Sequence, residues 1–181
     1  MGIKTSLINK IKRIAGTYEE TVFDLRKRGV KIGENVDVLN SKIDGDYGFL
    51  ISIGNNVTIT NATLLAHDAS TKKFLGKTKI GRIDIGDNVF IGLGAIVLPN
   101  SKIGNNVIIG AGCVVSGIVE DNSVMVGNPA KKLCSCDEYL EKHKQKMQAM
   151  PIFDTKIGCK NEETQKEILS KIDAGMIGYD N

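Results

Sequence analysis

The sequence is poor in the residues that mark several common classes of protein. Tryptophan is absent, aromatic residues make up 5% of the 181 positions, and proline occurs three times. No run of 18 apolar residues occurs, so no membrane-spanning helix is predicted. The four cysteines, at positions 113, 134, 136 and 159, lack the density of a secreted disulfide framework. We therefore expect reduced thiols and a cytoplasmic protein.

Charge and metal ligands are also sparse. The 24 basic and 21 acidic residues leave a net charge of +3, and no basic cluster is interleaved with aromatic residues, so no nucleic-acid partner is predicted. Cys134 and Cys136 have only Cys159 and His143 as further soft ligands. Because two neighbouring thiols rarely close a structural zinc site, we expect no metal.

What the sequence does have is 20 glycines and an apolar residue at every sixth position. This period excludes an amphipathic helix, whose apolar face repeats near 3.6 residues, and differs from the simple alternation of a half-buried strand. An earlier stretch keeps the rhythm with Ile53, Ile59 and Leu65. The unbroken column is Ile85, Ile91, Val97, Ile103, Ile109 and Val115, and a second column of mostly small residues follows it at Val89, Ala95, Ser101, Val107, Cys113 and Val119.

Paired turn residues follow the apolar positions, at Asn55-Asn56, Asp87-Asn88 and Asn105-Asn106. Glycine, asparagine and aspartate tolerate positive φ at the least cost, so these pairs suit a chain that bends every six residues. Each hexad then forms one short strand and one corner, and the stacked coils bury a core that no single coil buries alone. The sequence therefore predicts an all-β protein, a parallel β-helix.

The repeat is interrupted once. Leu65 and Ile85 are 20 positions apart, which is not a multiple of six, so residues 68–82 are expected to leave the coils as a loop. The predicted organisation is an N-terminal helical segment (1–29), a β-helix (30–133) and a C-terminal helical extension (134–181), with helices expected over 137–150 and over 161–175, the second capped by an asparagine.

His67 stands where the chain leaves the coils. Insertions in a solenoid often build its binding site, and a neutral imidazole takes up a proton at physiological pH, so His67 is the candidate general base. Asp68 follows directly, but neighbouring side chains of a strand point to opposite faces. Asp68 is therefore assigned to acceptor binding, and a role as the first residue of the loop remains open.

The sequence resembles the left-handed β-helix, hexapeptide-repeat acyltransferases, in the branch of the galactoside, maltose and polysaccharide O-acetyltransferases. The resemblance covers residues 30–133 and rests on 85–92 (IGDNVFIG), 103–116 (IGNNVIIGAGCVVS), 126–131 (VGNPAK) and the histidine before the loop. It implies direct acetyl transfer from acetyl-CoA to a saccharide hydroxyl, with His67 as base, in a homotrimer whose active sites lie between subunits.

The resemblance also implies a set of coenzyme A contacts. Backbone amides outside the coils would hold the pantetheine arm, a hydroxyl group would contact it, and two lysines would meet the phosphates. The matching positions are Gly92, Leu93, Ala111, Gly112, Ser116, Lys131 and Lys132. Cys113 falls in an interior column, so no covalent acyl-enzyme is expected.

Alternatives remain for the acceptor and for the N-terminus. N-acetylation of an amino-sugar nucleotide needs the same base, and a non-enzymatic β-helix scaffold needs no base. Residues 3–14 place Ile3, Leu7 and Ile11 on one helical face with lysines elsewhere. This segment either covers the open end of the β-helix or makes peripheral contact with an anionic membrane through residues 1–14.

Overall fold

A computed structural model describes residues 21–155, 161–173 and 175–180. The chain divides into two compact units, with the boundary between Cys136 and Asp137. The prediction for residues 1–14 lies outside the described residues, as does most of the predicted N-terminal helical segment. The sequence-based domain boundaries stay predictions.

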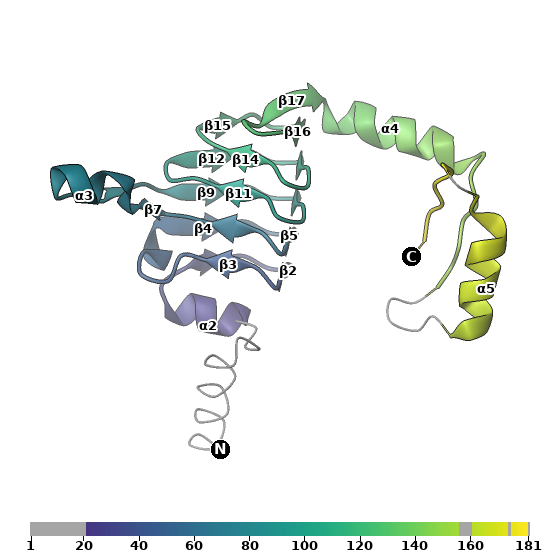
Figure 1. The fold of residues 1–181 in the computed structure, drawn as a ribbon, viewed down its shortest axis with the longest axis horizontal. Coiled ribbons are helices and arrows are strands. Elements are labelled where there is room, and N and C mark those ends of the chain that lie inside the picture. Colours follow the sequence, from purple (N-terminus) through teal and green to yellow (C-terminus); the bar gives the residue numbers. More distant parts are fainter. Residues whose placement is uncertain (1–20, 156–160, 174, 181) are drawn as a thin grey trace, which may run out of the picture. The chain divides into compact units, whose positions relative to one another are not determined.

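The larger unit is a stack of coils, and each coil except the last contributes one short strand to each of three sheets (Figure 1). Within each sheet, the strands of successive coils are parallel. The first sheet contains β1 (Lys31–Ile32), β4 (Ile51–Ile53), β9 (Ile83–Ile85), β12 (Ser101–Ile103) and β15 (Ile118–Val119). The second contains β2 (Val36–Leu39), β5 (Val57–Thr60), β10 (Val89–Ile91), β13 (Val107–Ile109), β16 (Ser123–Val126) and, antiparallel to β16, β17 (Lys131–Cys134). The third contains β3 (Lys42–Ile43), β6 (Thr63–Leu64), β11 (Ile96–Val97) and β14 (Val114–Val115).

The interior of the stack is formed by the two predicted columns. Every member of both, from Ile85 and Val89 to Val115 and Val119, is buried. Partners Val89 and Val107 are three hexads apart, so one coil uses three repeats. The prediction of a left-handed parallel β-helix with helical segments is confirmed.

One position of the expected register is wrong. Leu64, not Leu65, is fully buried, and it pairs with Val97 of the next coil. The reason is a corner one residue shorter than the hexad rule: Asn61 turns the chain there with a φ of 42°, so Leu64 follows Ile59 after five positions. Val97, in the next coil, follows Ile91 after six.

The first corner of each coil, between the first and second sheets, carries the turn pairs. Asn56, Asn88 and Asn106 all have φ between 54° and 56°, in the left-handed region that the pattern predicted. Their side-chain amides also bond from coil to coil, since Nδ2 of Asn56 donates to Asn88 and Nδ2 of Asn88 donates to Asn106, each over 3.1 Å. The same residues therefore bend the chain and tie the coils together.

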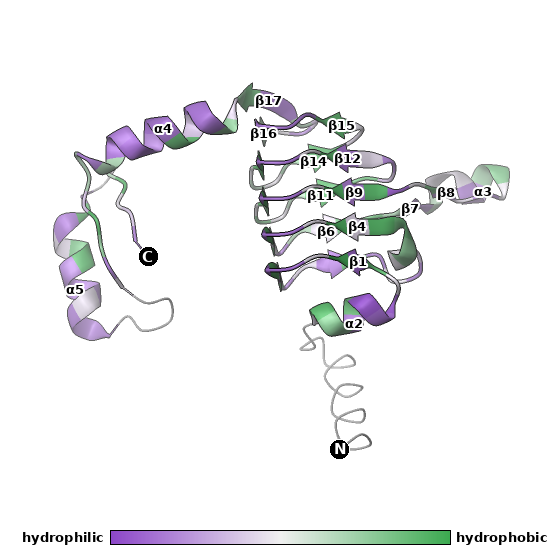
Figure 2. Cartoon of the chain, turned by 180° about the vertical axis from the view of Figure 1, so that it is seen from behind, coloured by the Kyte–Doolittle hydropathy of each residue, from purple (hydrophilic) through white to green (hydrophobic). Residues whose placement is uncertain are grey.

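Two insertions interrupt the third corner, which leads from the third sheet back to the first. The predicted loop is a hairpin of β7 (His67–Asp68) and antiparallel β8 (Lys79–Ile80), with η2 (Ala69–Thr71) and α3 (Lys72–Leu75) at its end (Figure 1). The second insertion, one coil earlier, contains η1 (Gly48–Leu50) and was not predicted. Hydrophobic residues at the end of α3 stand out in Figure 2, and Phe74 and Leu75 are 81% and 74% exposed.

A short helix, α2 (Val22–Lys27), covers the first coil. A capping box joins Thr21 and Asp24 at its N-terminus, and Leu25 is fully buried. Val30, three residues after this helix, is part of the same core. The predicted N-terminal helical character is thus present in the described part of residues 1–29.

The C-terminal unit contains most of α4 (Cys136–Met147) and all of α5 (Glu162–Lys171). The predicted asparagine cap is present, because Oδ1 of Asn161 accepts from the Thr164 amide over 2.9 Å, although α5 ends four residues before Gly175. His143 Nδ1 lies 2.9 Å from the Tyr179 hydroxyl. Among the helices that the structure describes, none has the length and apolarity required to span a membrane.

Candidate active site

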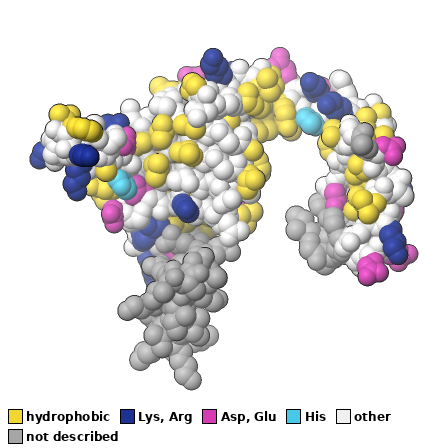
Figure 3. Space-filling view, in the orientation of Figure 1, with side chains coloured by type: hydrophobic (Ala, Val, Ile, Leu, Met, Phe, Trp, Pro, Cys, Tyr) yellow, Lys and Arg dark blue, Asp and Glu magenta, His cyan; other side chains and the backbone are white. Residues whose placement is uncertain are grey.

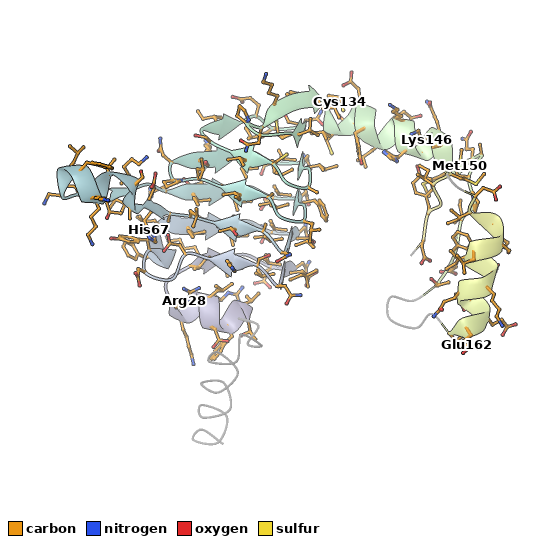
Figure 4. All side chains as sticks on the ribbon, in the orientation of Figure 1. Arg28, His67, Cys134, Lys146, Met150 and Glu162 are labelled. Atoms are coloured by element: carbon orange, nitrogen blue, oxygen red, sulfur yellow. The ribbon has the colours of Figure 1, made fainter. Side chains whose placement is uncertain are left out.

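His67 lies at the base of the projecting hairpin, where β7 leaves the coils (Figure 4). The main chain on either side is tied to the stack: Ala66 is fully buried, and its carbonyl accepts from the Gly81 amide over 2.9 Å. The His67 side chain is 34% exposed. The imidazole is therefore held by the β-helix and still open to a substrate.

The partner of His67 is Asp44, a fully buried carboxylate 23 positions earlier in the chain. Its Oδ2 lies 2.5 Å from His67 Nδ1 and also accepts from the backbone amides of Ala66, over 2.9 Å, and His67, over 3.0 Å. Its Oδ1 accepts from the amides of Asp46 and Tyr47. Every oxygen of this buried group is thus satisfied.

These contacts decide the charge of Asp44 and the tautomer of His67. Burial alone raises the pKa of a carboxyl group, but the hydrogen bonds from His67, Tyr47 and Ala66 outweigh it and hold the pKa of Asp44 below its ordinary value. A carboxylate accepts but does not donate, so Nδ1 of His67 carries the proton. Nε2 is left as the basic nitrogen, as a general base requires.

Sequence reasoning missed Asp44 and considered only Asp68 as a partner for the ring. Asp44 follows Ile43, which pairs with Leu64 of the next coil, so residues 44 and 66 meet at the same corner of the stack. The predicted register placed Leu65, not Leu64, in the core, and this one-residue error hides the contact. The sequence offered one signal: the hexad repeat also breaks just after Ile43, at the same corner of the stack as the predicted loop.

The Asp68 side chain bonds within the hairpin and not to the His67 imidazole. Its carboxylate lies 2.6 Å from Lys79 Nζ and accepts from the Ser70 amide, so it joins the two strands and caps η2. The Lys79 ammonium, followed by the bond from Ser70, lowers the pKa of Asp68 to about 2. Its assignment to acceptor binding stays a prediction.

Two aromatic rings lie beside the Asp44–His67 pair. The Tyr47 ring centroid is 5.1 Å from that of His67, and Phe49 is 6.1 Å from Tyr47. Both rings belong to the unpredicted insertion around η1, and Phe49 is 58% exposed. The insertion therefore contributes an apolar, accessible surface next to the catalytic candidate.

Four of the predicted coenzyme A residues meet at the second corner, between the second and third sheets. The Gly112 amide donates to the Leu93 carbonyl over 2.8 Å, which stacks the Gly92-Leu93 and Ala111-Gly112 corners of two coils. Gly112 has a φ of 69° and open space where a side chain would point, whereas a Cβ on Gly92 would lie 2.8 Å from the Ala111 nitrogen. Coil stacking therefore explains Gly92, and open surface lies beside Gly112.

The remaining three residues lie elsewhere in the larger unit. Ser116 is at the third corner, at the other end of β14 from Gly112, and is exposed. Lys131 and Lys132 are exposed on β17, just after Ala130, whose amide donates to the Val114 carbonyl over 2.9 Å. All seven assignments stay predictions. Within the described parts of the chain, no three metal-ligating side chains converge.

Known proteins share the repeat sequence of this chain. A family model described as bacterial transferase hexapeptide (six repeats) matches residues 82–117. Protein CapG of Staphylococcus aureus is 46% identical over 122 residues, which cover 64% of this chain and 71% of CapG. The chain belongs to the hexapeptide-repeat acyltransferase family. The putative acetyltransferase YvoF of Bacillus subtilis (strain 168) is 34% identical over 96 residues, and the match spans 52% of this chain and about half, 54%, of YvoF.

Solved structures share the fold of this hexapeptide-repeat acyltransferase. A galactoside acetyltransferase in complex with coenzyme A aligns with a TM-score of 0.52 at 23% identity, covering 75% of this chain and 82% of that one. A hexapeptide-repeat-containing acetyltransferase of Vibrio cholerae, complexed with acetyl coenzyme A, aligns with a TM-score of 0.50 at 20% identity and covers 68% and 78% of the two chains. At these identities the likeness is one of architecture.

Proposed function

We propose that the protein transfers the acetyl group of acetyl-CoA to a hydroxyl group of a saccharide, such as a capsule, O-antigen or other polysaccharide precursor. The observation that carries this proposal is the Asp44–His67 pair at the mouth of the hairpin. Membership of the acyltransferase family supports the reaction class, and the two rings beside the pair, half-buried Tyr47 and exposed Phe49, support a sugar acceptor.

His67 acts as the general base. Nε2 removes the proton of the acceptor hydroxyl while the oxygen attacks the thioester carbonyl carbon. The C–O bond forms, the C–S bond breaks, and the thiolate of coenzyme A leaves and takes up the proton from the imidazolium. Asp44 stabilises the imidazolium between these steps and keeps the ring in one orientation, because its carboxylate stays charged.

Direct transfer needs no nucleophile from the protein. Cys113 is fully buried, its thiol donates to the Met125 carbonyl over 3.3 Å, and burial raises the pKa of the thiol. A thiol in that state is a poor nucleophile, because the reactive species is the thiolate. Cys113 therefore serves as a small core residue.

The donor and subunit contacts follow the family resemblance. We propose that acetyl-CoA lies along the outside of the coils from β9 to β16, the upper coils. Backbone amides near Leu93 and Gly112 would contact the pantetheine arm, and Lys131 and Lys132 would lie near the phosphates. A homotrimer would complete the site. Phe74 and Leu75, which are 81% and 74% exposed at the end of the hairpin, offer apolar surface for such a contact, and hydrophobic and basic side chains gather there (Figure 3).

The test is an acetyl-transfer assay with a panel of saccharides and amino-sugar nucleotides. His67→Asn is expected to lower kcat by about 10²- to 10⁴-fold, the usual contribution of a general base, with an unchanged melting temperature. The matched control is His143→Asn, in the C-terminal unit, which is expected to keep full activity.

Full activity of His67→Asn would remove the base from the proposal. Transfer to amino-sugar nucleotides alone would replace O-acetylation with N-acetylation. Failure of folded protein to bind acetyl-CoA would favour a scaffold.

A further inference from the structure

A groove crosses the outer face of the first sheet. Four predicted coenzyme A residues lie away from it at the second corner, whereas Ser116 adjoins its end at Gly117. The groove consists of two hollows, of about 530 and 240 Å³, which share Arg82 and Asp84 in their linings. The larger continues past Lys102 to Ile118, and the smaller continues past Lys31 to Phe49. The groove therefore extends over several coils.

Three cations line this groove without acidic partners. Lys31, Arg82 and Lys102 are exposed, and within the described ranges none of them forms an ion pair. Lys31, Ser52, Asp84 and Lys102 are in register on four neighbouring strands. Because strands lie about 4.8 Å apart, the Cα atoms of the two lysines are about 14 Å from each other. Arg82 lies beside the middle of this column.

The groove is connected to the active site by the aromatic residues. Phe49 lines the smaller hollow and is 6.1 Å from the Tyr47 ring, which is 5.1 Å from His67. A ligand that reaches from the imidazole across both rings would therefore enter the cationic groove at Lys31 and Arg82. Aromatic faces suit the apolar C–H face of a sugar ring. Along this path a ligand would meet first the candidate base, then the two aromatic rings and then the cations.

The length of the cationic part favours one kind of anion. A single carboxylate would engage one of the three cations, whereas a diphosphate carries several charged oxygens and can meet more than one of these long, flexible side chains. Arginine matches phosphate oxygens in a fork, and lysine meets them as a point charge. Asp84, the one carboxylate in the lining, lies in register beside Lys102, so the three cations and this carboxylate leave the groove with a net positive charge.

We propose that the groove binds the diphosphate that links an acceptor sugar to its carrier. The sugar lies against Tyr47 and Phe49, with its hydroxyl at His67. The proposal rests on the proposed function for the transfer step, but binding of the diphosphate is independent of it. Two sources share this chemistry: a nucleoside diphosphate sugar and a prenyl diphosphate sugar. The acceptor is therefore a charged precursor and not a neutral free saccharide.

The experiment is a calorimetric titration of the full chain with three probes: uridine diphosphate, geranyl diphosphate and, as the neutral control, uridine. Saturating coenzyme A is present so that the probes do not report the donor site. Wild type is compared with Arg82→Gln, with Lys131→Ala as the donor-site control and Lys144→Gln, exposed on α4, as the charge-matched control.

We expect Arg82→Gln to weaken diphosphate binding by roughly tenfold, since hydrogen bonds to charged groups are among the stronger ones, while both control variants bind as wild type does. Uridine should not bind measurably. Tighter binding of uridine diphosphate than of geranyl diphosphate assigns the acceptor to sugar nucleotides, and the reverse order assigns it to lipid-linked sugars.

In the transfer assay with the preferred acceptor class, Arg82→Gln should raise the KM for the acceptor and leave the KM for acetyl-CoA unchanged. Diphosphate affinity equal in Arg82→Gln and wild type overturns the proposal. So does a loss of oligomeric state in Arg82→Gln at unchanged affinity, because the groove is then an interface between copies of the chain. Arg82-dependent diphosphate binding without any acetyl transfer by wild type would leave the groove assignment standing and sink the proposed function.

Discussion

The coils from β9 to β16 and the coils from β1 to β8 are built from the same repeat but differ in how strictly they keep it. In the upper coils, Val89 and Val107 stack in register three hexads apart, and no insertion interrupts residues 83–126. In the lower coils, the third corner is interrupted twice, around η1 and by the β7–β8 hairpin. Asp44, His67, Tyr47 and Phe49 all come from these interruptions or their edges.

This difference separates two tasks. Regular coils repeat a main-chain surface, which suits a donor held by backbone amides, and the predicted coenzyme A residues from Gly92 to Ser116 all lie there. Interrupted coils place side chains of chosen chemistry at one corner, as loops on a rigid scaffold commonly do. We therefore expect the regular coils to supply stability, and the interrupted coils supply the candidate catalytic groups.

The largest effect on stability is expected from the regular coils. Ile91 is fully buried between Ile59 and Ile109, so Ile91→Ala leaves a cavity and should lower the free energy of unfolding by about 2–5 kcal/mol. Phe49→Ala, on the exposed insertion, should change it by only about 0.5 kcal/mol. Urea denaturation measures both, and equal losses would erase the distinction between the two regions.

Asp44→Asn tests the interrupted corner. The acidic partner that orients His67 is lost, so kcat should fall by at least about tenfold, comparable to the loss of other groups that orient a functional histidine. Rescue of the full rate at higher pH in the variant would contradict an orienting role and indicate a simple charge effect.

The same variant should change acid stability. The pKa of Asp44 is lower in the folded protein than its ordinary value of 3.8, so the folded state binds the proton less readily than the unfolded state. Its contribution is complete above pH 3.8 and is lost as the pH falls below 3.8 through the folded value. Denaturation at a series of acid pH values should therefore show a steeper loss for wild type than for Asp44→Asn.

A smaller effect is expected at the asparagine corners. Asn88 has a φ of 56° and bonds to Asn56 and Asn106, so Asn88→Ala should cost about 1–2 kcal/mol of unfolding free energy, mostly from the left-handed backbone. Asn88→Gly keeps the backbone free and loses only the side-chain bonds, and it should cost less. A larger loss in the glycine variant would assign the corner to the amide ladder instead.

The smallest effect is expected at the proposed donor site. Lys131 is exposed, so Lys131→Ala should raise the KM for acetyl-CoA by only roughly two- to fivefold and leave the KM for the acceptor unchanged. High salt should remove the difference between variant and wild type. An effect on the acceptor alone would move Lys131 out of the donor site.

The fold was predictable in the upper coils because each hexad reports its own conformation. The two columns that begin at Ile85 and Val89 are recognised from residues six positions apart, and the turn pairs mark the corners. Leu65 was misplaced because positions 64 and 65 are both leucine, which hides the shift made by the shortened corner at Asn61. The asparagine cap of α5 was found because capping is local, whereas the end of that helix at Lys171 was not.

The catalytic candidate was half predictable. His67 is visible in the sequence because it adjoins a break in the repeat. Asp44 was not, because a carboxylate 23 positions away becomes its partner only through the register of two coils. Tyr47 and Phe49 were missed for the same reason, since the shorter insertion was not recognised.

The sequence by itself determined the β-helix, its buried columns and the position of the main loop, because period and turn chemistry act within six residues. The tertiary structure decided which side chains meet. Stacking of parallel coils brings Asp44 to His67 and sets Lys31, Arg82 and Lys102 along one groove. Those neighbours depend on the lengths of the corners and insertions between them and on the register in which the coils stack, and the apolar period does not record either.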